Sequence, residues 1–369
     1  MDRVVLISGS SNEPLAKSIS SHLNIPLTPT NFSPYPSGES RVEILSSVRN
    51  RTVYLIQSGY THEPTSPSPN DHIMQTVMLA DACHHASARE IVLVMPCLPY
   101  AEEPEDVDDI DPEEIECETE LQTFMKESIF PSAFIPLPQP EFYYDLKRQQ
   151  SILKSQSPPA TDPLPIFTHP DPFKLIASLL QCSGANHLLT LHLPRPQLVG
   201  YFDIPVDDLS IIPILHNKFD KYTFSTTDIS MAKQASQIAR SLQRPFTLLH
   251  RLSPQKDFNI NREEVVDKHI LLVDEMDDRL FQAVKELKSF SVASVSLLFI
   301  HLLLKDPQKD LKRLESTTEF DRIFITNSIR IPESLKSCDH IEIIDISAYL
   351  AKAIECLQLG NSLKQIQIK

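Results

Sequence analysis

Short apolar segments that alternate with helical ones are the feature that most constrains what this chain can fold into. Strands are predicted at Val4–Ser8, Val53–Gln57 and Ile91–Met95, and the last is apolar at every position, as strands buried on both faces are. Helical spacing of apolar side chains predicts helices at Pro14–Leu23 and Asp71–Ala86 between them. This order predicts an α/β fold in which a mainly parallel sheet is flanked by helices.

A second series of the same kind occupies the other half of the chain. Strands are predicted at Lys221–Ser225, Phe246–His250, His269–Asp274, Ala293–Leu304, Ile323–Thr326 and Ile341–Asp345, with helices at Ser230–Leu242, Arg279–Leu287 and Ile346–Leu357. The 369 residues suffice for two domains, each with its own core. We therefore expect two α/β domains that share an architecture.

An acidic and proline-rich stretch separates the two series. Residues 102–120 contain twelve Asp or Glu and no Lys or Arg, so this block holds most of the net charge of −15 and leaves −3 for the rest. Proline-rich sequence follows and cannot sustain a helix or a central strand. We expect residues 101 to about 170 to be an insertion that is disordered or lies over the surface, either as a docking segment or as a spacer.

The composition excludes several classes of protein. The net negative charge excludes a nucleic-acid footprint, which is basic. No apolar run is long enough to span a bilayer, and the chain begins on a strand-like run, so we expect neither a membrane segment nor a signal peptide. The six cysteines are scattered without a CxxC pair, which is typical of thiols in a reducing compartment and favours the cytoplasm.

Glycine is too rare for the usual phosphate-binding loops. The chain has six glycines, and no two lie closer than sixteen residues, so neither GxGxxG nor GxxxxGK[ST] occurs. Such loops use glycine because backbone N–H groups must approach phosphate oxygens closely. The sequence therefore offers few means of building a phosphate cradle.

Several segments resemble the phosphoribosyl pyrophosphate (PRPP) synthetase family, in that family's order: GESRVEI, SSVRNRTVYLIQSG, GANHLLTLHLPRPQLVGYFDIPVDDL and FITNSIRIPESLKSCDHIEIIDIS. The resemblance implies two phosphoribosyltransferase-like (type I) domains, at 1–208 and 209–355, with the tail of about 356–369 returning to the first. It implies a dimer to hexamer of homologous subunits. It also implies an activity that uses ATP and Mg²⁺ to convert ribose 5-phosphate into PRPP.

The ATP positions that the resemblance assigns are retained only in part. Glu39 and Gln57 match residues of the family's ATP site. An arginine expected to touch ATP is replaced by Glu102, and a carboxylate at that place repels a polyphosphate.

The metal and catalytic positions are also altered. His192 and Asp228 match the family's metal-binding positions, but Thr190 replaces an aspartate. Arg251 stands at the position of a lysine in the family's flexible catalytic loop, and arginine does not replace lysine freely at a phosphate. Arg251, His192 and Asp228 are the candidate remnants of a catalytic site, with a structural role for His192 and Asp228 as the alternative.

This sequence differs most from the family in the loop that binds ribose 5-phosphate there. Asp274 and Glu275 retain the acidic pair that the resemblance assigns to the ribose hydroxyls. Arg279, Phe281 and Gln282 replace the Thr, Gly and Thr of the phosphate cradle. We expect Phe281 to fill the space of the phosphate. Arg279 either recovers some anion binding or belongs to a helix whose acidic first turn complements the helix dipole.

A regulatory position matches better. Ser47 and Arg49 correspond to a loop of the family's regulatory phosphate site between subunits, although a solvated turn explains them equally well.

These substitutions lead to a functional hypothesis. Each phosphate-binding element has lost glycine, hydroxyl or cation, whereas the apolar strands are intact. We therefore expect a catalytically silent subunit that assembles with active PRPP synthetase subunits and regulates them. The alternatives are an active ribose-phosphate diphosphokinase, acting alone or through a composite site, and a separate module that binds a nucleotide or sugar phosphate.

Overall fold

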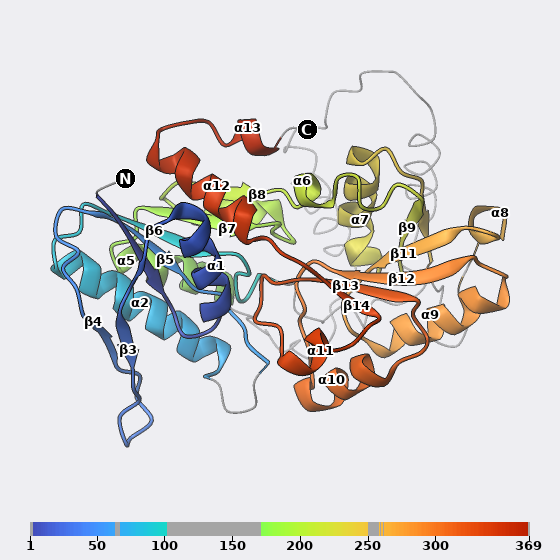
Figure 1. Cartoon of the computed structure of the whole chain (residues 1–369), viewed down its shortest axis with the longest axis horizontal. Coiled ribbons are helices and arrows are strands. Elements are labelled where there is room, and N and C mark those ends of the chain that lie inside the picture. The colour runs from blue at the N-terminus through green and yellow to red at the C-terminus, as the bar shows by residue number, and fades with distance from the viewer. Residues whose placement is uncertain are drawn as a thin grey trace, which may run out of the picture. The chain divides into compact units, whose positions relative to one another are not determined.

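Two six-stranded sheets organise the chain, and in each of them all neighbouring strands are parallel (Figure 1). This computed structural model describes residues 3–62, 67–101, 171–249, 258, 260 and 262–367. Both sheets belong to one compact unit made of Met1–Pro104 and Pro172–Lys369. The expected insertion lies outside the described residues, and the boundary between 208 and 209 stays a prediction.

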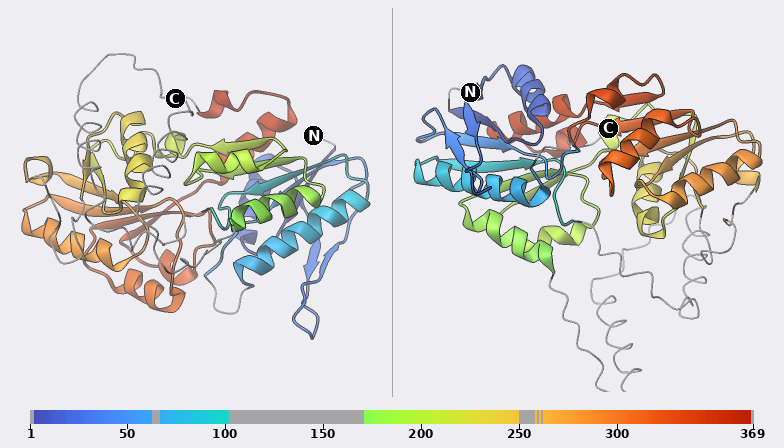
Figure 2. Two further views of the ribbon diagram at one scale, coloured as in Figure 1. Left: turned by 180° about the vertical axis from the view of Figure 1, so that it is seen from behind. Right: turned by 90° about the horizontal axis from the view of Figure 1, so that it is seen from below.

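The first sheet has the strand order β2-β1-β5-β6-β7-β8. Its strands are β1 (Val4–Ser8), β2 (Leu27–Thr28), β5 (Thr52–Ile56), β6 (Glu90–Met95), β7 (His187–Leu191) and β8 (Val206–Leu209). Helices α2 (Pro69–His85) and α5 (Pro172–Cys182) cover one face, and α1 (Glu13–Leu23) and α12 (Ser347–Gln358) cover the other (Figure 2). An antiparallel hairpin of β3 (Thr30–Phe32) and β4 (Val42–Ile44) projects beside it.

The second sheet has the strand order β10-β9-β11-β12-β13-β14. Its strands are β9 (Tyr222–Thr226), β10 (Phe246–Leu248), β11 (His269–Val273), β12 (Ser294–Phe299), β13 (Arg322–Thr326) and β14 (Ile341–Ile344). Helix α7 (Ile229–Ser241) packs on one face, and α9 (Asp278–Ser289), α10 (Pro307–Ser316) and α11 (Glu333–Lys336) lie on the other.

Burial on both faces explains why the strands are apolar at successive positions. In β11, Ile270 and Leu272 face the core beneath α9, whereas Leu271 and Val273 face the core beneath α7. Side chains alternate between faces along a strand, so a central strand covered on both faces needs an apolar residue at each position. This arrangement confirms the expected α/β fold with parallel sheets.

The C-terminal helix packs on the first sheet rather than the second. Leu350 and Ile354 of α12 share a buried cluster with Leu15 and Ile19 of α1. The chain thus leaves the second sheet after β14 and returns to the first, which ties the two ends of the described chain together.

One predicted strand is too long. The apolar run Ala293–Leu304 was expected to be a single strand, but β12 ends at Phe299 and the chain then turns with His301 half-buried. Apolar side chains continue past the strand because Ile300 and Leu302 fill the core from a loop. Hydrophobicity alone does not mark the end of a strand.

Short elements were not predicted from the sequence. They are β2, β3, β8, the 3₁₀ turn η3 (Pro196–Tyr201), α6 (Ile212–Leu215), α8 (Arg262–Val265), α10, α11 and α13 (Lys364–Gln367). Most span six residues or fewer, too few to show a periodic pattern. No described helix is both long and apolar enough to cross a membrane.

Replacing Ser68 with alanine is expected to lower the free energy of unfolding by about 1 kcal/mol. The hydroxyl of Ser68 accepts the amide of Asp71, and the Asp71 carboxylate accepts the amide of Ser68 at 2.8 Å, so α2 begins with a reciprocal cap. Urea denaturation measures the change. Ser178→Ala in the middle of α5, where the hydroxyl bonds only a carbonyl of its own helix, is the control and is expected to lose nothing. Equal losses in both variants would count against the capping role.

Candidate functional site

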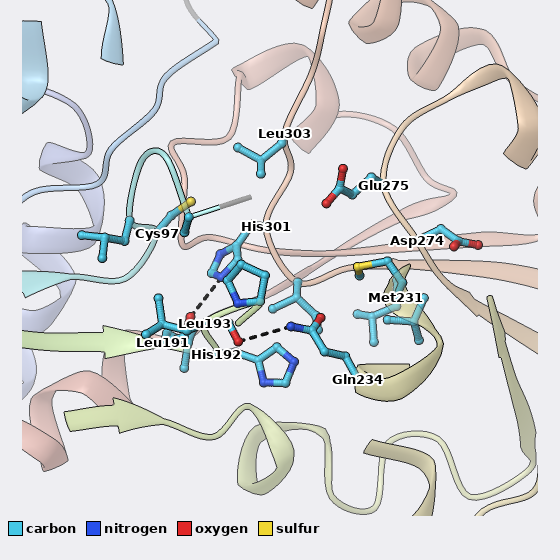
Figure 3. A pocket seen from close by; sticks show the side chains of 16 residues that line it. Cys97, Leu191, His192, Leu193, Met231, Gln234, Asp274, Glu275, His301 and Leu303 are labelled. Carbon is cyan, nitrogen blue, oxygen red and sulfur yellow. Dashed lines mark hydrogen bonds between the residues drawn. The ribbon is translucent and has the colours of Figure 1, made fainter. Parts of the chain in front are cut away.

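Side chains that follow strands of both sheets gather around one pocket (Figure 3). Cys97 follows β6, His192 follows β7, Asp274 and Glu275 follow β11, and His301 follows β12. The carboxyl ends of parallel strands are where α/β proteins place their ligand sites. The pocket has a volume of about 50 Å³, far less than the roughly 300–1,000 Å³ of usual small-molecule sites.

His301 is held by both ring nitrogens. Its Nε2 lies 3.0 Å from the carbonyl oxygen of Leu191, and its Nδ1 lies 2.8 Å from Oγ of Ser328. A carbonyl oxygen only accepts, so Nε2 carries the proton in this arrangement. Burial lowers the pKa of His301 to about 4, and the ring is neutral at pH 7. His301 therefore links the end of β7 to the loop after β12.

His192 lies in the same pocket with an unsatisfied nitrogen. Its backbone adopts the left-handed conformation, with φ of 52°, and its Nε2 is buried without a hydrogen-bond partner. Burial, followed by the neighbouring His301, lowers the pKa of His192 to about 4. The ring is thus neutral, and its free nitrogen is the polar atom here that a water or ligand would satisfy.

Asp274 faces protein groups rather than open solvent. It is 4% exposed, and its two carboxyl oxygens accept the amide of Thr227 at 3.1 and 3.0 Å while the hydroxyl of Thr226 donates to Oδ1. Burial raises the pKa of Asp274 to about 8, so the group is mainly protonated at pH 7. Glu275, the other member of the acidic pair, is half-buried and lines the pocket.

The N-terminus of α9 is capped by the protein's own carboxylates. Oδ1 of Asp277 accepts the amide of Leu280 at 2.8 Å, and Nε of Arg279 donates to Oδ2 of Asp277 at 2.6 Å. Nη2 of Arg279 also lies 3.7 Å from the carboxylate of Asp228. A helix N-terminus and an arginine are anion-binding groups, and both are engaged by internal anions here. Anion binding by Arg279 therefore stays a prediction, and an anion would have to compete with Asp277 and Asp228 for the guanidinium.

Phe281 does not occupy the place expected for it. Its ring is 2% exposed and packs edge to face against Phe320, with centroids 5.5 Å apart, and the guanidinium of Arg313 covers it. This is the apolar core beneath the second sheet, so the expectation that Phe281 fills a phosphate space is wrong. Asp278 lies in the first turn of α9, which agrees with the alternative given for Arg279, a helix with an acidic first turn.

The two residues assigned to ATP, Gln57 and Glu39, lie in different surroundings, one buried and the other exposed. Gln57 is 1% exposed, and its side chain bonds Ser11 and His72 inside the first sheet. A Cβ on Gly9 would lie 1.8 Å from Oε1 of Gln57, so glycine is required there for Gln57 to fit. Glu39 lies in the exposed β3–β4 hairpin and accepts a hydrogen bond from Ser37. A nucleotide role for either residue stays a prediction.

Other predicted residues lie outside the pocket or outside the described chain. Ser47 and Arg49 are exposed on the loop before β5, at the opposite end of the strands, so a regulatory role for them stays a prediction. Arg251 and Glu102 lie outside the described residues.

The residues present do not fit a magnesium site. Mg²⁺ prefers carboxylate and water oxygens in octahedral geometry. Of the two candidates, His192 offers an imidazole nitrogen and Asp228 is engaged with Arg279. Among the described residues no group of three or more His, Cys, Asp or Glu side chains is close enough to hold a metal ion.

Polar contacts between the two sheets were missed in the sequence. Nδ2 of Asn12 donates to the carbonyl of Asn327 at 3.0 Å, and Oγ of Ser58 donates to that of Ser328 at 2.5 Å. His62 also lies 2.5 Å from the carbonyl of Leu302. Each of these side chains follows a strand of the first sheet. A polar residue at the carboxyl end of a strand was the sequence feature that could have predicted these contacts.

Comparison with known proteins found a matching family and a similar solved structure. Residues 4–121 match the family described as the N-terminal domain of ribose phosphate pyrophosphokinase. The solved structure of phosphoribosylpyrophosphate synthetase from Mycobacterium smegmatis superposes with a TM-score of 0.70 at 21% identity, over 97% of this chain and 100% of that chain. The family match supports a ribose-phosphate pyrophosphokinase relationship for the N-terminal part, and the superposition shows that the described residues share the two-domain α/β fold of that structure.

Proposed function

We propose that this chain is a ribose-phosphate pyrophosphokinase homologue that serves as a non-catalytic, regulatory subunit in a complex of PRPP synthetase subunits. The proposal rests on the family match of residues 4–121, the shared fold and the state of the candidate site. Its context is nucleotide biosynthesis.

The first turn of α9 carries the proposal. Transfer of a diphosphate group to a sugar phosphate needs free amides and cations that meet the developing negative charge. Here the Leu280 amide and the Arg279 guanidinium both bind Asp277. An incoming phosphate would have to displace the carboxylate of Asp277. It would also lie beside the acids Asp277 and Asp278 of the same turn. Such juxtaposition of like charges opposes binding.

The pocket supports the same proposal. Its volume of about 50 Å³ holds water but not a nucleotide. The two histidines are neutral, and Asp274 is mainly protonated at pH 7. The described part of the pocket therefore offers no full charge, apart from Glu275, to bind or orient a charged substrate.

Exposed apolar side chains on elements that pack beside the first sheet favour assembly with other subunits. The large apolar residues left exposed include Leu45 after β4, Met74 on α2, Leu175 on α5 and Tyr201 in η3, with Leu45 62% and Leu175 60% exposed. The four lie on neighbouring elements, because β4 contacts α2, α2 contacts α5, and α5 contacts η3. Clusters of exposed apolar residues mark protein contact surfaces. We propose that homologous PRPP synthetase subunits bind here.

An assay of PRPP formation tests the proposed function. With ATP, Mg²⁺ and ribose 5-phosphate, the purified chain alone is expected to produce no PRPP. Added to an active homologous synthetase, it is expected to co-elute and to change the rate by about fivefold or more, the lower end of usual coupling between sites. Leu175→Asp places a charge on the proposed contact and is expected to abolish both effects, whereas Lys312→Asp, at an exposed residue of α10, is the control.

Two results would count against the proposal. Turnover by the chain alone at a rate usual for enzymes, about 1–1,000 s⁻¹, would favour the active-enzyme alternative. A mixture that neither co-elutes nor changes in rate would remove the regulatory role while leaving the family relationship untouched.

A further inference from the structure

Three arginines occupy equivalent positions at the amino ends of neighbouring strands in the first sheet. Arg3 precedes β1, Arg51 precedes β5 and Arg89 precedes β6, and these strands are adjacent in the order β1-β5-β6. The register pairs Val4 with Thr52 and Thr52 with Glu90, so the residues one position earlier form a row. We call Arg3, Arg51 and Arg89 the arginine row.

Backbone hydrogen bonds hold the arginine row together. The amide of Thr52 donates to the carbonyl of Arg3 at 2.9 Å, and the amide of Arg89 donates to the carbonyl of Arg51 at 2.9 Å. Neighbouring strands lie about 4.8 Å apart, so three guanidinium groups start from main-chain positions spaced by about that distance. All three arginines are exposed, and none forms an ion pair with a described residue.

Among the described residues, neighbouring groups do not neutralise the positive charge of the arginine row. Like charges at adjacent positions on neighbouring strands destabilise a sheet. Helix α2 ends at His85 near this edge, and its C-terminus supplies the equivalent of about half a negative charge, which does not balance three cations. The last turn of α2 carries His84 and His85 rather than acids. The described surroundings therefore leave a local excess of positive charge on a chain whose net charge is −15.

We propose that the arginine row binds the acidic segment 102–120 of a second copy of this chain. Guanidinium groups bind carboxylates through paired N–H donors, and the segment offers twelve carboxylates with no competing Lys or Arg. The row is an exposed line of charges rather than a concave site, which suits an extended acidic peptide better than a small ion. Outside that segment the net charge is only −3, so the segment is the matching anion in this sequence. This contact between copies goes beyond the proposed regulatory role and does not depend on it.

Binding of a fluorescent peptide with the sequence of residues 102–120 to the full chain tests the proposal. Fluorescence anisotropy is expected to show binding that weakens as NaCl is raised. The variant Arg3→Glu, Arg51→Glu, Arg89→Glu is expected to bind the peptide about tenfold more weakly or worse. The control variant Lys221→Glu, Lys233→Glu, Arg322→Glu changes three exposed cations before β9, on α7 and at the start of β13. It alters the net charge equally and is expected to bind like the unchanged chain.

Sedimentation of the chain without peptide provides the second measurement. The unchanged chain is expected to self-associate in low salt, and the arginine-row variant is expected to remain smaller at the same concentration. The milder variant Arg3→Gln, Arg51→Gln, Arg89→Gln repeats the test should charge reversal impair folding, which circular dichroism reports. Equal losses in the row variant and the control would overturn the proposal, as would peptide binding that the row variant leaves unchanged.

Discussion

Replacing Phe219 with alanine is expected to lower the free energy of unfolding by about 3–5 kcal/mol. Phe219 is 2% exposed, and its ring centroid lies 4.9 Å from that of Phe324 and 5.6 Å from that of Tyr222, both in edge contact. It belongs to the buried cluster that also contains residues of α1 and α12. Removing the ring therefore opens a cavity where the layers of both sheets meet, and a packed core closes such cavities only in part.

Chemical denaturation followed by circular dichroism measures this loss. Phe219→Leu conserves most of the volume and is expected to cost less than about 1.5 kcal/mol. Tyr35→Ala, in the exposed β3–β4 hairpin with 48% of the residue accessible, removes a ring of similar size and is expected to change stability by no more than about 0.5 kcal/mol. A loss for Phe219→Ala no larger than that for Tyr35→Ala would mean that the aromatic cluster does not stabilise the core.

Between about pH 6.5 and pH 8 the free energy of unfolding is expected to fall by up to about 2 kcal/mol, and Asp274→Asn is expected to abolish this slope. Burial raises the pKa of Asp274 from 3.8 to about 8. In this pH range the unfolded chain has released the proton that the folded chain retains. The contribution of Asp274 to stability is therefore fully present at low pH and is lost as the pH rises through the folded pKa.

Other buried groups titrate mainly below pH 6.5. Burial lowers the pKa of His192 and His301 from 6.5 to about 4, which removes stability as the pH falls below 6.5. Burial raises the pKa of Asp208 to about 6, so the contribution of Asp208 to stability is lost mainly below pH 6.5. These opposing changes overlap between pH 4 and 6.5, whereas Asp274 dominates above that range.

Urea denaturation at closely spaced pH values measures the slope. Asp345→Asn is the matched control, because the pKa of Asp345 lies below its usual value and the group does not titrate in this window. That variant loses hydrogen bonds to Asn327 and Ser347 and is expected to be less stable at every pH with the slope unchanged. If the Asp274→Asn chain kept the slope of the unchanged protein, another group would have to be its source.

Most of the two sheets was predictable from local sequence. The segments Val4–Ser8 and His269–Val273 consist mainly of apolar residues, and a strand covered on both faces requires such residues irrespective of its neighbours. Helices such as α9 showed apolar side chains at helical spacing. The end of β12 was not predictable, because Ile300 and Leu302 are buried from a loop and read like a continued strand.

The candidate site was predictable in its residues but not in its contacts. The sequence showed that a glycine-poor acidic turn follows β11. It did not show that Asp277 caps its own helix, that Arg279 bridges Asp277 and Asp228, or that Phe281 turns into the core. These contacts depend on the direction in which each side chain projects from the first turn of the helix.

The sequence by itself determined the repeated strand–helix order, the acidic block and the loss of glycine from the loops, because each is a property of neighbouring residues. Only the tertiary structure decided which groups are neutralised. Asp228 meets Arg279 because β9 and β11 are adjacent in the sheet, and His301 meets Leu191 because the two sheets contact each other there. Charge state depends on burial and on partners in space, and the spacing of residues along the chain does not encode either.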